Sequence, residues 1–248
     1  MHRFYLPPAE CQTGSPALTG REAHHAVRVL RLRRGDAVTV LDGAGLELSC
    51  VVHASDRDLV QLAVLKKNLL PAPRHQITLL QAIPKGKIIE SIIQKAVELG
   101  VHRIVPLLTE RVTTRLDGDN AAHKAEKLQH VAIEAIKQCG SAWLPKIETP
   151  LTPGEFLARG EKFDLPLIAS LQPGARPARE YFQNFQTERG CKPASVCIWI
   201  GPEGDFTAAE VSAAQAAGAL PITLGRLVLR VETAATYCLS ILNHELQA

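Results

Sequence analysis

Ile198-Trp-Ile-Gly-Pro-Glu-Gly-Asp-Phe206 and Leu224-Gly-Arg-Leu-Val-Leu-Arg-Val-Glu-Thr-Ala-Ala235 are the two stretches that decide the fold of this chain. Each predicts an apolar strand, a glycine-containing loop and then a helix. Gly201, Gly204 and Gly225 remove side chains from the loops, so the backbone can approach a flat ligand closely. Ligands of open α/β sheets bind at the carboxyl ends of strands. The pair of loops therefore predicts one pocket, although Gly-Pro-Glu-Gly taken alone is equally compatible with a simple turn.

The composition is that of an ordinary globular protein. The 248 residues are 46% hydrophobic and only 4% aromatic, so the core must be aliphatic. A net charge of +3 is a weak indication of an anionic partner. The six cysteines form no Cys-x-x-Cys pair, and neither a signal peptide nor a membrane-spanning stretch is apparent. We expect a reducing, cytoplasmic location.

The first part of the chain is predicted to be β-rich. Strands are expected at 37–41, 46–53 and 59–65, with a hairpin turn at 42–45. A short helix is expected at 22–31. Pro71-Ala72-Pro73 then interrupts the pattern, because proline forces the residue before it into extended backbone. We therefore expect two domains, 1–71 and 74–248.

Apolar strands alternate with amphipathic helices in the second part. This alternation is typical of an α/β domain with a mainly parallel sheet. The capping-box pattern Thr207-Ala-Ala-Glu210 predicts a helix start directly after the first glycine loop. The expected strands are 77–82, 102–107, 165–170, 195–200 and 221–224. The expected helices are 88–99, 121–139, one within 176–193, one from 208, and a last one from about 232.

Several common ligand signatures are missing from the sequence. The nearest approach to a dinucleotide-binding glycine motif, Gly43-Ala-Gly-Leu-Glu-Leu48, lacks the third glycine and leads into a strand. There is no P-loop, no HExxH and no clustered metal-ligand set. His24 and His25 point apart on a helix, so polar surface or RNA contact is a better interpretation than a metal pair.

The motifs, taken together, resemble a known family. Ile200-Gly-Pro-Glu-Gly204, followed by Leu224-Gly-x-x-x-Leu-Arg-x-Glu-Thr-Ala234, is similar to the cofactor end of the SPOUT methyltransferases. More closely, the chain resembles the bacterial 16S ribosomal RNA (uracil-N3)-methyltransferases. His25–Arg31 with Gly35-Asp36, then Gln81–Lys87, Gln94–Val101 and Thr109-Glu-Arg111 match that family in order.

The resemblance implies a PUA-like β-barrel followed by a SPOUT-type α/β domain whose C-terminal part is tied in a trefoil knot. It also implies a homodimer that binds S-adenosylmethionine in the knot and acts on 16S ribosomal RNA or the small ribosomal subunit, without a metal. The chain departs from the family pattern at Asp205, where a second glycine is usual, and in the run around Ser141.

The resemblance also supplies the expected site residues. Eleven residues of the two loops and their flanks are expected to bind the cofactor: Leu171, Ile200, Gly201, Glu203, Gly204, Leu224, Gly225, Leu229, Arg230, Thr233 and Ala234. Arg230 and Glu232 are the candidate catalytic residues, since a guanidinium can stabilise charge on a uracil and a carboxylate can accept a proton. The alternatives are an ion pair of Arg230 with Glu232 or Glu203, and a purely structural charge at Glu232 in the first helical turn.

Basic residues are expected to contact RNA phosphates. One set lies among few acids in the N-terminal part and the other follows predicted strand ends: His25, Arg28, Arg31, Arg33 and Arg34, then Lys85, Lys87, Arg111 and Arg115. A solvated charged surface is the alternative for each of them. Two rival functions stay open, namely another SPOUT activity on a ribose 2′-O or a guanine, and a non-catalytic RNA-binding protein with a relic pocket.

Overall fold

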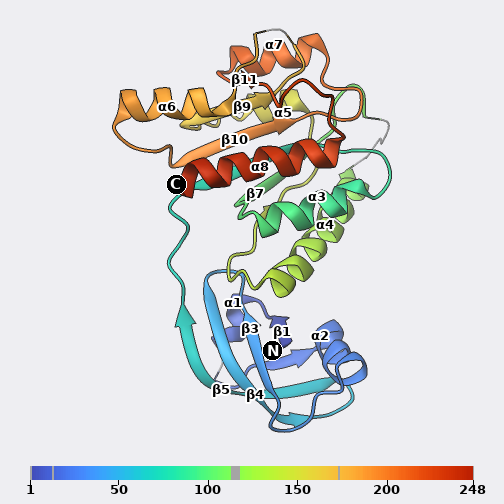
Figure 1. Ribbon diagram of the computed structural model, residues 1–248. Helices are drawn as coiled ribbons and strands as arrows, with labels where there is room; N and C mark the ends of the chain where they lie inside the picture. Colours follow the sequence, from blue (N-terminus) through green and yellow to red (C-terminus); the bar gives the residue numbers. More distant parts are fainter. Residues whose placement is uncertain (1, 13, 113–117, 173, 248) are drawn as a thin grey trace. The chain divides into compact units, whose positions relative to one another are not determined.

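The computed structural model describes residues 2–12, 14–112, 118–172 and 174–247 (Figure 1). The chain forms two compact units, and the second interrupts the first. Unit 1 comprises Met1–Ala72 and Ile133–Leu144, and unit 2 comprises Pro73–Ala132 and Pro145–Ala248. The predicted domains, 1–71 and 74–248, do not include this later segment, Ile133–Leu144, in the first unit. As functional boundaries, those limits stay a prediction.

Unit 1 is built on a five-stranded sheet. Its order is β1-β3-β4-β5-β2, in which β1 and β3 are parallel and the other neighbours antiparallel. The strands are β1 (His2–Tyr5), β2 (Ala17–Thr19), β3 (Ala37–Leu41), β4 (Leu46–Ser55) and β5 (Leu59–Leu69).

One hydrophobic core serves this whole sheet. Every strand contributes a buried side chain to it, among them Phe4, Leu18, Val40, Leu48 and Val60. Such a core is expected of a sheet that curls around its own interior. Two short helices, α1 (Pro8–Cys11) and α2 (Gly20–His24), and a π-helical turn, His25–Val29, complete this part of the unit.

Unit 2 contains a six-stranded sheet that is parallel throughout. Its order is β11-β9-β10-β6-β7-β8. The strands are β6 (Gln76–Ala82), β7 (Arg103–Leu107), β8 (Lys146–Ile147), β9 (Leu165–Ala169), β10 (Ser195–Ile200) and β11 (Leu220–Ile222). The central strands β6 and β10 are buried on both faces, which explains the apolar run of β10 and the mainly apolar sequence of β6, where Thr78 and Gln81 are buried polar residues.

Helices cover both faces of this sheet (Figure 1). On one face, α5 and α7 pack around a core that includes Phe156, Trp199 and Phe206. On the other, α8 packs against β10 and α3, and Asn243 Nδ2 donates a hydrogen bond to the carbonyl of Leu99 at 2.9 Å. The helices are α3 (Ile88–Glu98), α4 (Gly118–Cys139), α5 (Pro153–Ala158), α6 (Ala178–Arg189), α7 (Ala208–Ala216) and α8 (Val231–Gln247).

Most predicted elements are confirmed, including the α/β class with a parallel sheet. The capping box of α7 is present, with the Thr207 side chain accepting from the backbone of Glu210. The shortest elements, β1, β2, β8, α1 and α5, were not predicted. Cys139, the last residue of α4, is exposed. The trefoil knot stays a prediction.

Candidate functional site

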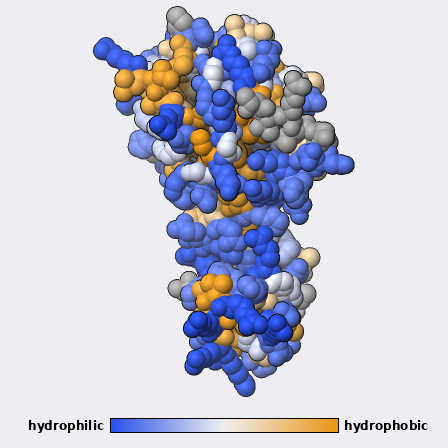
Figure 2. Space-filling model, turned by 90° about the vertical axis from the view of Figure 1, so that its right-hand side faces the viewer, coloured by the Kyte–Doolittle hydropathy of each residue, from blue (hydrophilic) through white to orange (hydrophobic). Residues whose placement is uncertain are grey.

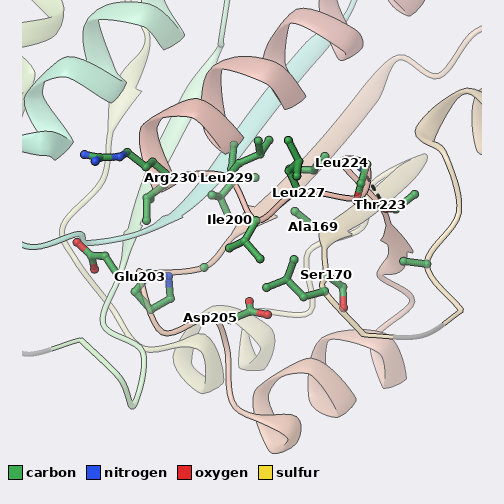
Figure 3. Close-up of a pocket in the computed structure, with 18 of the residues that line it drawn as sticks. Ala169, Ser170, Ile200, Glu203, Asp205, Thr223, Leu224, Leu227, Leu229 and Arg230 are labelled. Atoms are coloured by element: carbon green, nitrogen blue, oxygen red, sulfur yellow. Dashed lines mark hydrogen bonds between the residues drawn. The ribbon is translucent and has the colours of Figure 1, made fainter.

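A cavity of about 800 Å³ opens at the carboxyl ends of β9, β10 and β11 (Figure 3). Three loops line it: the loop after β9, the Gly-Pro-Glu-Gly loop after β10, and the loop from Thr223 to Arg230 that leads into α8. Adjacent parallel strands end at the same edge of a sheet, so their loops are brought together. The two loops singled out in the sequence therefore do line a single pocket, as predicted.

The loop after β10 makes a tight turn. The N–H of Asp205 donates to the carbonyl of Pro202 at 2.9 Å. A Cβ added at Gly201 would stand 3.2 Å from the Asp205 Cα and 3.2 Å from the Phe206 nitrogen. Gly201 is thus required by the returning loop itself, a different reason from the close approach to a ligand that the sequence suggested.

The loop after β11 turns at Gly225. This residue has a φ of 108°, in the region that favours glycine, and nothing described lies within 4 Å of a Cβ built there. The Thr223 hydroxyl accepts from the Gly225 N–H at 3.2 Å. The loop then presents Leu224, Leu227 and Leu229 at one side of the cavity (Figure 3).

Nine of the eleven predicted cofactor residues line the cavity. Gly204 and Thr233 do not. Most of the loop after β9 was not predicted to line the cavity, and only Leu171 was named there. Its further lining residues are Ala169, Ser170, Gln172, Gly174 and Ala175. A usable signal was present, since this segment also follows a buried strand directly and contains a glycine.

Arg230 and Glu203 lie at one end of the cavity in Figure 3, and Asp205 lies farther along it, towards Ser170. Glu232 also lines the cavity. Among the described residues, the Arg230 side chain has neither an ion pair nor a hydrogen-bond partner, so the alternative of an ion pair with Glu203 or Glu232 is not found. Glu232 stands in the first turn of α8, where a negative charge is favourable.

Loops that follow β6 and β7 are tied to the loop after β10. The backbone N–H of Lys85 donates to Glu203 Oε1 at 2.9 Å. Arg111 Nη1 donates to the carbonyl of Gly204. Lys85 and Lys87 are both exposed, and the Lys85 contact places that predicted RNA-contacting residue beside the cavity loop. Arg115 lies outside the described residues.

The predicted RNA-contacting residues of unit 1 are mostly solvent-facing. Arg28, Arg31 and Arg33 are exposed. The backbone N–H of Arg33 donates to Asp36 Oδ2 at 2.7 Å. His25 is half-buried, and its ring lies edge-on to Phe4 with centroids 6.1 Å apart. His25 therefore packs against the core of the unit as well as bordering its surface.

The described ranges show neither a metal-binding cluster nor a membrane-spanning helix. These residues contain no group of three or more His, Cys, Asp or Glu side chains arranged to hold a metal ion. None of the helices found there is long and apolar enough to span a membrane.

Comparisons with known proteins agree with this architecture. A family model for an RNA methyltransferase domain matches residues 71–243, and one for an RNA methyltransferase PUA domain matches residues 18–65. The ribosomal RNA small subunit methyltransferase E of Synechocystis is 34% identical over 100% of this chain and 78% of its own length. The Bacillus subtilis protein of that name is 29% identical over 99% and 97%.

Solved structures give the same result. The ribosomal RNA small subunit methyltransferase E of Neisseria gonorrhoeae, bound to S-adenosylmethionine, superposes with a TM-score of 0.85 at 27% identity, covering 98% of this chain and 97% of that one. A methyltransferase candidate from Legionella pneumophila, also with S-adenosylmethionine, gives a TM-score of 0.88 at 32% identity, covering 98% and 96%. The chain belongs to the ribosomal RNA small subunit methyltransferase E family.

Proposed function

We propose that this chain transfers the methyl group of S-adenosylmethionine to N3 of one uridine in 16S ribosomal RNA. The observation that carries the proposal is the cavity at the ends of β9, β10 and β11, which is lined by the guanidinium of Arg230, a group without a partner among the described residues. Family membership supplies the reaction class, and Arg230 supplies a group suited to the target base.

The cavity fits S-adenosylmethionine in size and in chemistry. Its volume of about 800 Å³ lies within the range of about 300–1,000 Å³ found for ligand sites. The leucine side chains at 171, 224 and 229 with Ile200 would contact the adenine and ribose, and the glycine loops expose main chain to the adenine edge. The cofactor supplies an electrophilic methyl group carried on a sulfonium.

Arg230 is suited to stabilise the uracil during transfer. The N3–H bond must be lost as the N3–methyl bond forms, and negative charge then spreads onto the flanking carbonyl oxygens. A guanidinium placed beside those oxygens stabilises this charge. Its lack of an ion pair in the described structure leaves its donors available for the base.

Glu232 has two possible roles, and they differ in a measurable way. As the base it would accept the N3 proton, so its replacement by Gln should remove the acidic limb of the pH–rate profile. As a structural charge it would stabilise the first turn of α8, so the same replacement should lower stability and leave the profile unchanged. The Glu203 contact with Lys85 favours a positioning role for that second carboxylate.

We assign RNA binding to the exposed basic residues of the two units, considered separately. In unit 1, Arg28, Arg31 and Arg33 would contact phosphates, and His25 would support that surface through its packing on Phe4. In unit 2, Lys85 and Lys87 would contact phosphates, and Arg111 would support that surface through its contact with the loop at Gly204. Phosphate contacts predict binding that weakens steeply as salt rises. On the face shown in Figure 2, hydrophilic residues predominate and apolar residues form small separate groups.

We further propose that the enzyme is a cytoplasmic homodimer. Two apolar side chains of the loop before α8, Leu227 and Val228, are each 78% exposed, and Tyr237 of α8 is 47% exposed. Covering such side chains with a second copy would remove apolar surface from water. Light scattering should give twice the chain mass, and Leu227→Asp should shift it to that of one chain; a monomeric wild-type protein would overturn this proposal.

Mass spectrometry of the modified nucleosides tests the proposed function. Small-subunit RNA from a strain lacking the gene should contain no N3-methyluridine at the target site, and the purified protein with S-adenosylmethionine should restore it. Persistence of N3-methyluridine in that RNA would reject the assignment. A missing 2′-O-methyl or methylguanosine instead would favour the first rival. Failure to bind S-adenosylmethionine in calorimetry would favour a relic pocket.

A further inference from the structure

Asp205 stands in an unusual backbone conformation beside the cavity. It follows the turn that the Pro202 carbonyl closes, and its φ of 61° lies in the left-handed region. Glycine adopts this conformation without steric cost, and aspartate is among the few other residues that tolerate it. This chain therefore has an aspartate where a glycine would be less strained, and such a backbone outlier beside a binding site invites a functional explanation.

The Asp205 carboxylate has one oxygen committed to the loop and one free. Oδ1 accepts the backbone N–H of Phe206 at 2.8 Å. Within the described structure, Oδ2 has no hydrogen-bond or ion-pair partner. The residue is half-buried and lines the cavity, and Figure 3 shows its carboxylate between Glu203 and Ser170. One carboxylate oxygen is thus available to a ligand.

The charge on the ligand changes during the proposed reaction. S-adenosylmethionine carries a sulfonium cation, and its product, S-adenosylhomocysteine, has a neutral thioether at the same place. Their amino and carboxylate groups are identical. A negative charge near the sulfur therefore favours the cofactor over the product, and in a partly enclosed site this attraction is screened less than in water.

We propose that the free oxygen of Asp205 faces the sulfonium of the bound cofactor, and that Asp205 is thereby a specificity-determining residue that makes the pocket prefer the cationic cofactor to the neutral product. The inference rests on the proposed function, because it presupposes S-adenosylmethionine in this cavity. Methyl transfer breaks the sulfur–methyl bond and leaves the electron pair on sulfur, so the positive charge disappears there. The attraction of Asp205 for the ligand is lost in the same step, which favours product release.

Two substitutions separate charge from loop shape. Asp205→Asn keeps a side chain that tolerates left-handed backbone and keeps an oxygen that can accept from Phe206, so chiefly the charge is removed. Asp205→Gly removes the charge and the strain together. Glu188→Gln, on the exposed side of α6 and away from the cavity, is the matched control for a change of one unit in net charge.

Isothermal titration calorimetry of the full-length protein gives the test. Each variant is titrated with S-adenosylmethionine, S-adenosylhomocysteine and sinefungin, in which an amine-bearing carbon replaces the sulfonium. We expect both Asp205 variants to bind S-adenosylmethionine and sinefungin about three- to tenfold more weakly, with S-adenosylhomocysteine changed less than twofold. Glu188→Gln should match the wild type for all three ligands. Thermal unfolding without ligand checks that each variant is folded.

The outcomes distinguish this inference from the proposed function. An equal loss of affinity for all three ligands would make Asp205 a loop-shaping residue and overturn the inference, as would unchanged affinities. A wild-type protein that binds none of the ligands would overturn the proposed function as well. If neither variant folds, the wild-type preference for S-adenosylmethionine over S-adenosylhomocysteine should narrow as salt rises; a preference independent of salt would reject the electrostatic origin.

Discussion

At the scale of the single residue, Arg230 is the side chain whose position matters most for catalysis. It lines the cavity and is exposed, with no ion-pair partner in the described structure. Arg226 lies four positions earlier in the same loop and also lines the cavity. The two arginines carry the same charge. Replacing each in turn therefore distinguishes a specific contact of Arg230 with the base from the general electrostatic effect of a positive charge in the loop.

We expect Arg230→Ala to lower the rate of methyl transfer by about 10²–10³-fold, the usual cost of removing one donor to a developing oxyanion. Cofactor affinity should change less than threefold. Arg226→Ala should lower the rate much less, because the proposed mechanism assigns the contact with the base to Arg230 alone. Single-turnover rates with saturating cofactor, together with calorimetric affinities, test this. A parallel loss of cofactor binding in Arg230→Ala would assign that residue to pocket architecture instead.

The six cysteines differ sharply in environment, and this also is a property of single residues. Burial raises the pKa of the Cys197 and Cys238 thiols to about 12. Burial likewise raises the pKa of Cys11 and Cys50 to about 11. Cys139 and Cys191 are exposed. Because the thiolate is the reactive form, the four buried thiols should be nearly inert in the folded protein.

Titration with a thiol-reactive disulfide reagent at pH 8 should therefore modify two cysteines rapidly in the native protein and all six after denaturation. Replacing Cys139 and Cys191 by Ser should remove the fast phase entirely. Fast modification that persists in the double variant would show that a core thiol is accessible, contrary to the burial described.

At the scale of the element, the edge of the unit 2 sheet is anchored by a buried carboxylate. The side chain of Glu148, directly after β8, is 7% exposed; it accepts from Arg159 at 2.6 Å and from Arg103 at 3.3 Å. Burial raises the pKa of Glu148, but the Arg159 hydrogen bond and the Arg103 and Arg159 charges outweigh it, and the net pKa lies below its usual range.

We expect Glu148→Gln to lower the free energy of unfolding by about 1–2 kcal/mol at pH 7, because the half-buried Arg103 and the exposed Arg159 lose one counter-charge and keep only Glu161. A depressed carboxyl pKa stabilises the fold above the unfolded-state pKa, and this contribution is lost as pH falls through the folded-state value. The difference in free energy of unfolding between the wild type and Glu148→Gln should therefore become smaller below about pH 4.5.

The matched control is Glu98→Gln, which breaks the exposed ion pair with Lys95 at 2.9 Å. This replacement should lower the free energy of unfolding by about 0.5 kcal/mol or less. Urea unfolding of all three proteins between pH 3 and pH 7 provides the measurement. Equal losses for the two variants, or a gap that does not depend on pH, would contradict the anchoring role of Glu148.

The elements also show how far the sequence alone could lead. Local patterns were sufficient for α3, whose buried face repeats within one segment, and for β6, which is a short and mainly apolar run. The capping box indicated the start of α7 locally. β1 was missed because its four residues pair with β3, more than thirty residues away, and carry no turn signal of their own.

The same reasoning applies to the candidate site. Loops that follow buried strands could be assigned to one pocket because parallel strands end at a common edge. The contact of Glu203 with Lys85 and that of Arg111 with Gly204 each join segments about a hundred residues apart, so no local pattern reveals them. The left-handed conformation of Asp205 arises from the turn before it, which the Gly-Pro-Glu-Gly motif indicates only in outline.

At the scale of the whole molecule, unit 1 is assembled from two distant parts of the chain. The segment 133–144 returns to the strands of residues 1–72. Lys137, whose side chain is 7% exposed, pairs with Glu22 at 2.8 Å. The N–H of Gly45 donates to the carbonyl of Ala142 at 3.0 Å, and that of Leu144 to the carbonyl of Gly43 at 2.9 Å. Unit 1 therefore depends on a segment that the sequence placed in the other domain.

A fragment of residues 1–72 should accordingly be much less stable than the same fragment joined to 133–144 through a flexible linker of about twenty Gly and Ser residues. Restoring the Lys137 pair and the two backbone hydrogen bonds should raise the melting temperature by about 10–20 °C, since in a small domain each kcal/mol shifts it by about 4–8 °C. Lys137→Ala in the fusion should cancel much of this gain, because Glu22 is left without its cation.

In the full chain, Lys137→Ala should weaken the amide protection of β3 and β4. Lys124→Ala, which changes a side chain of α4 in unit 2, should leave that protection unchanged. Circular dichroism and hydrogen exchange supply these measurements, and a 1–72 fragment as stable as the fusion would show that the strands form a self-sufficient domain.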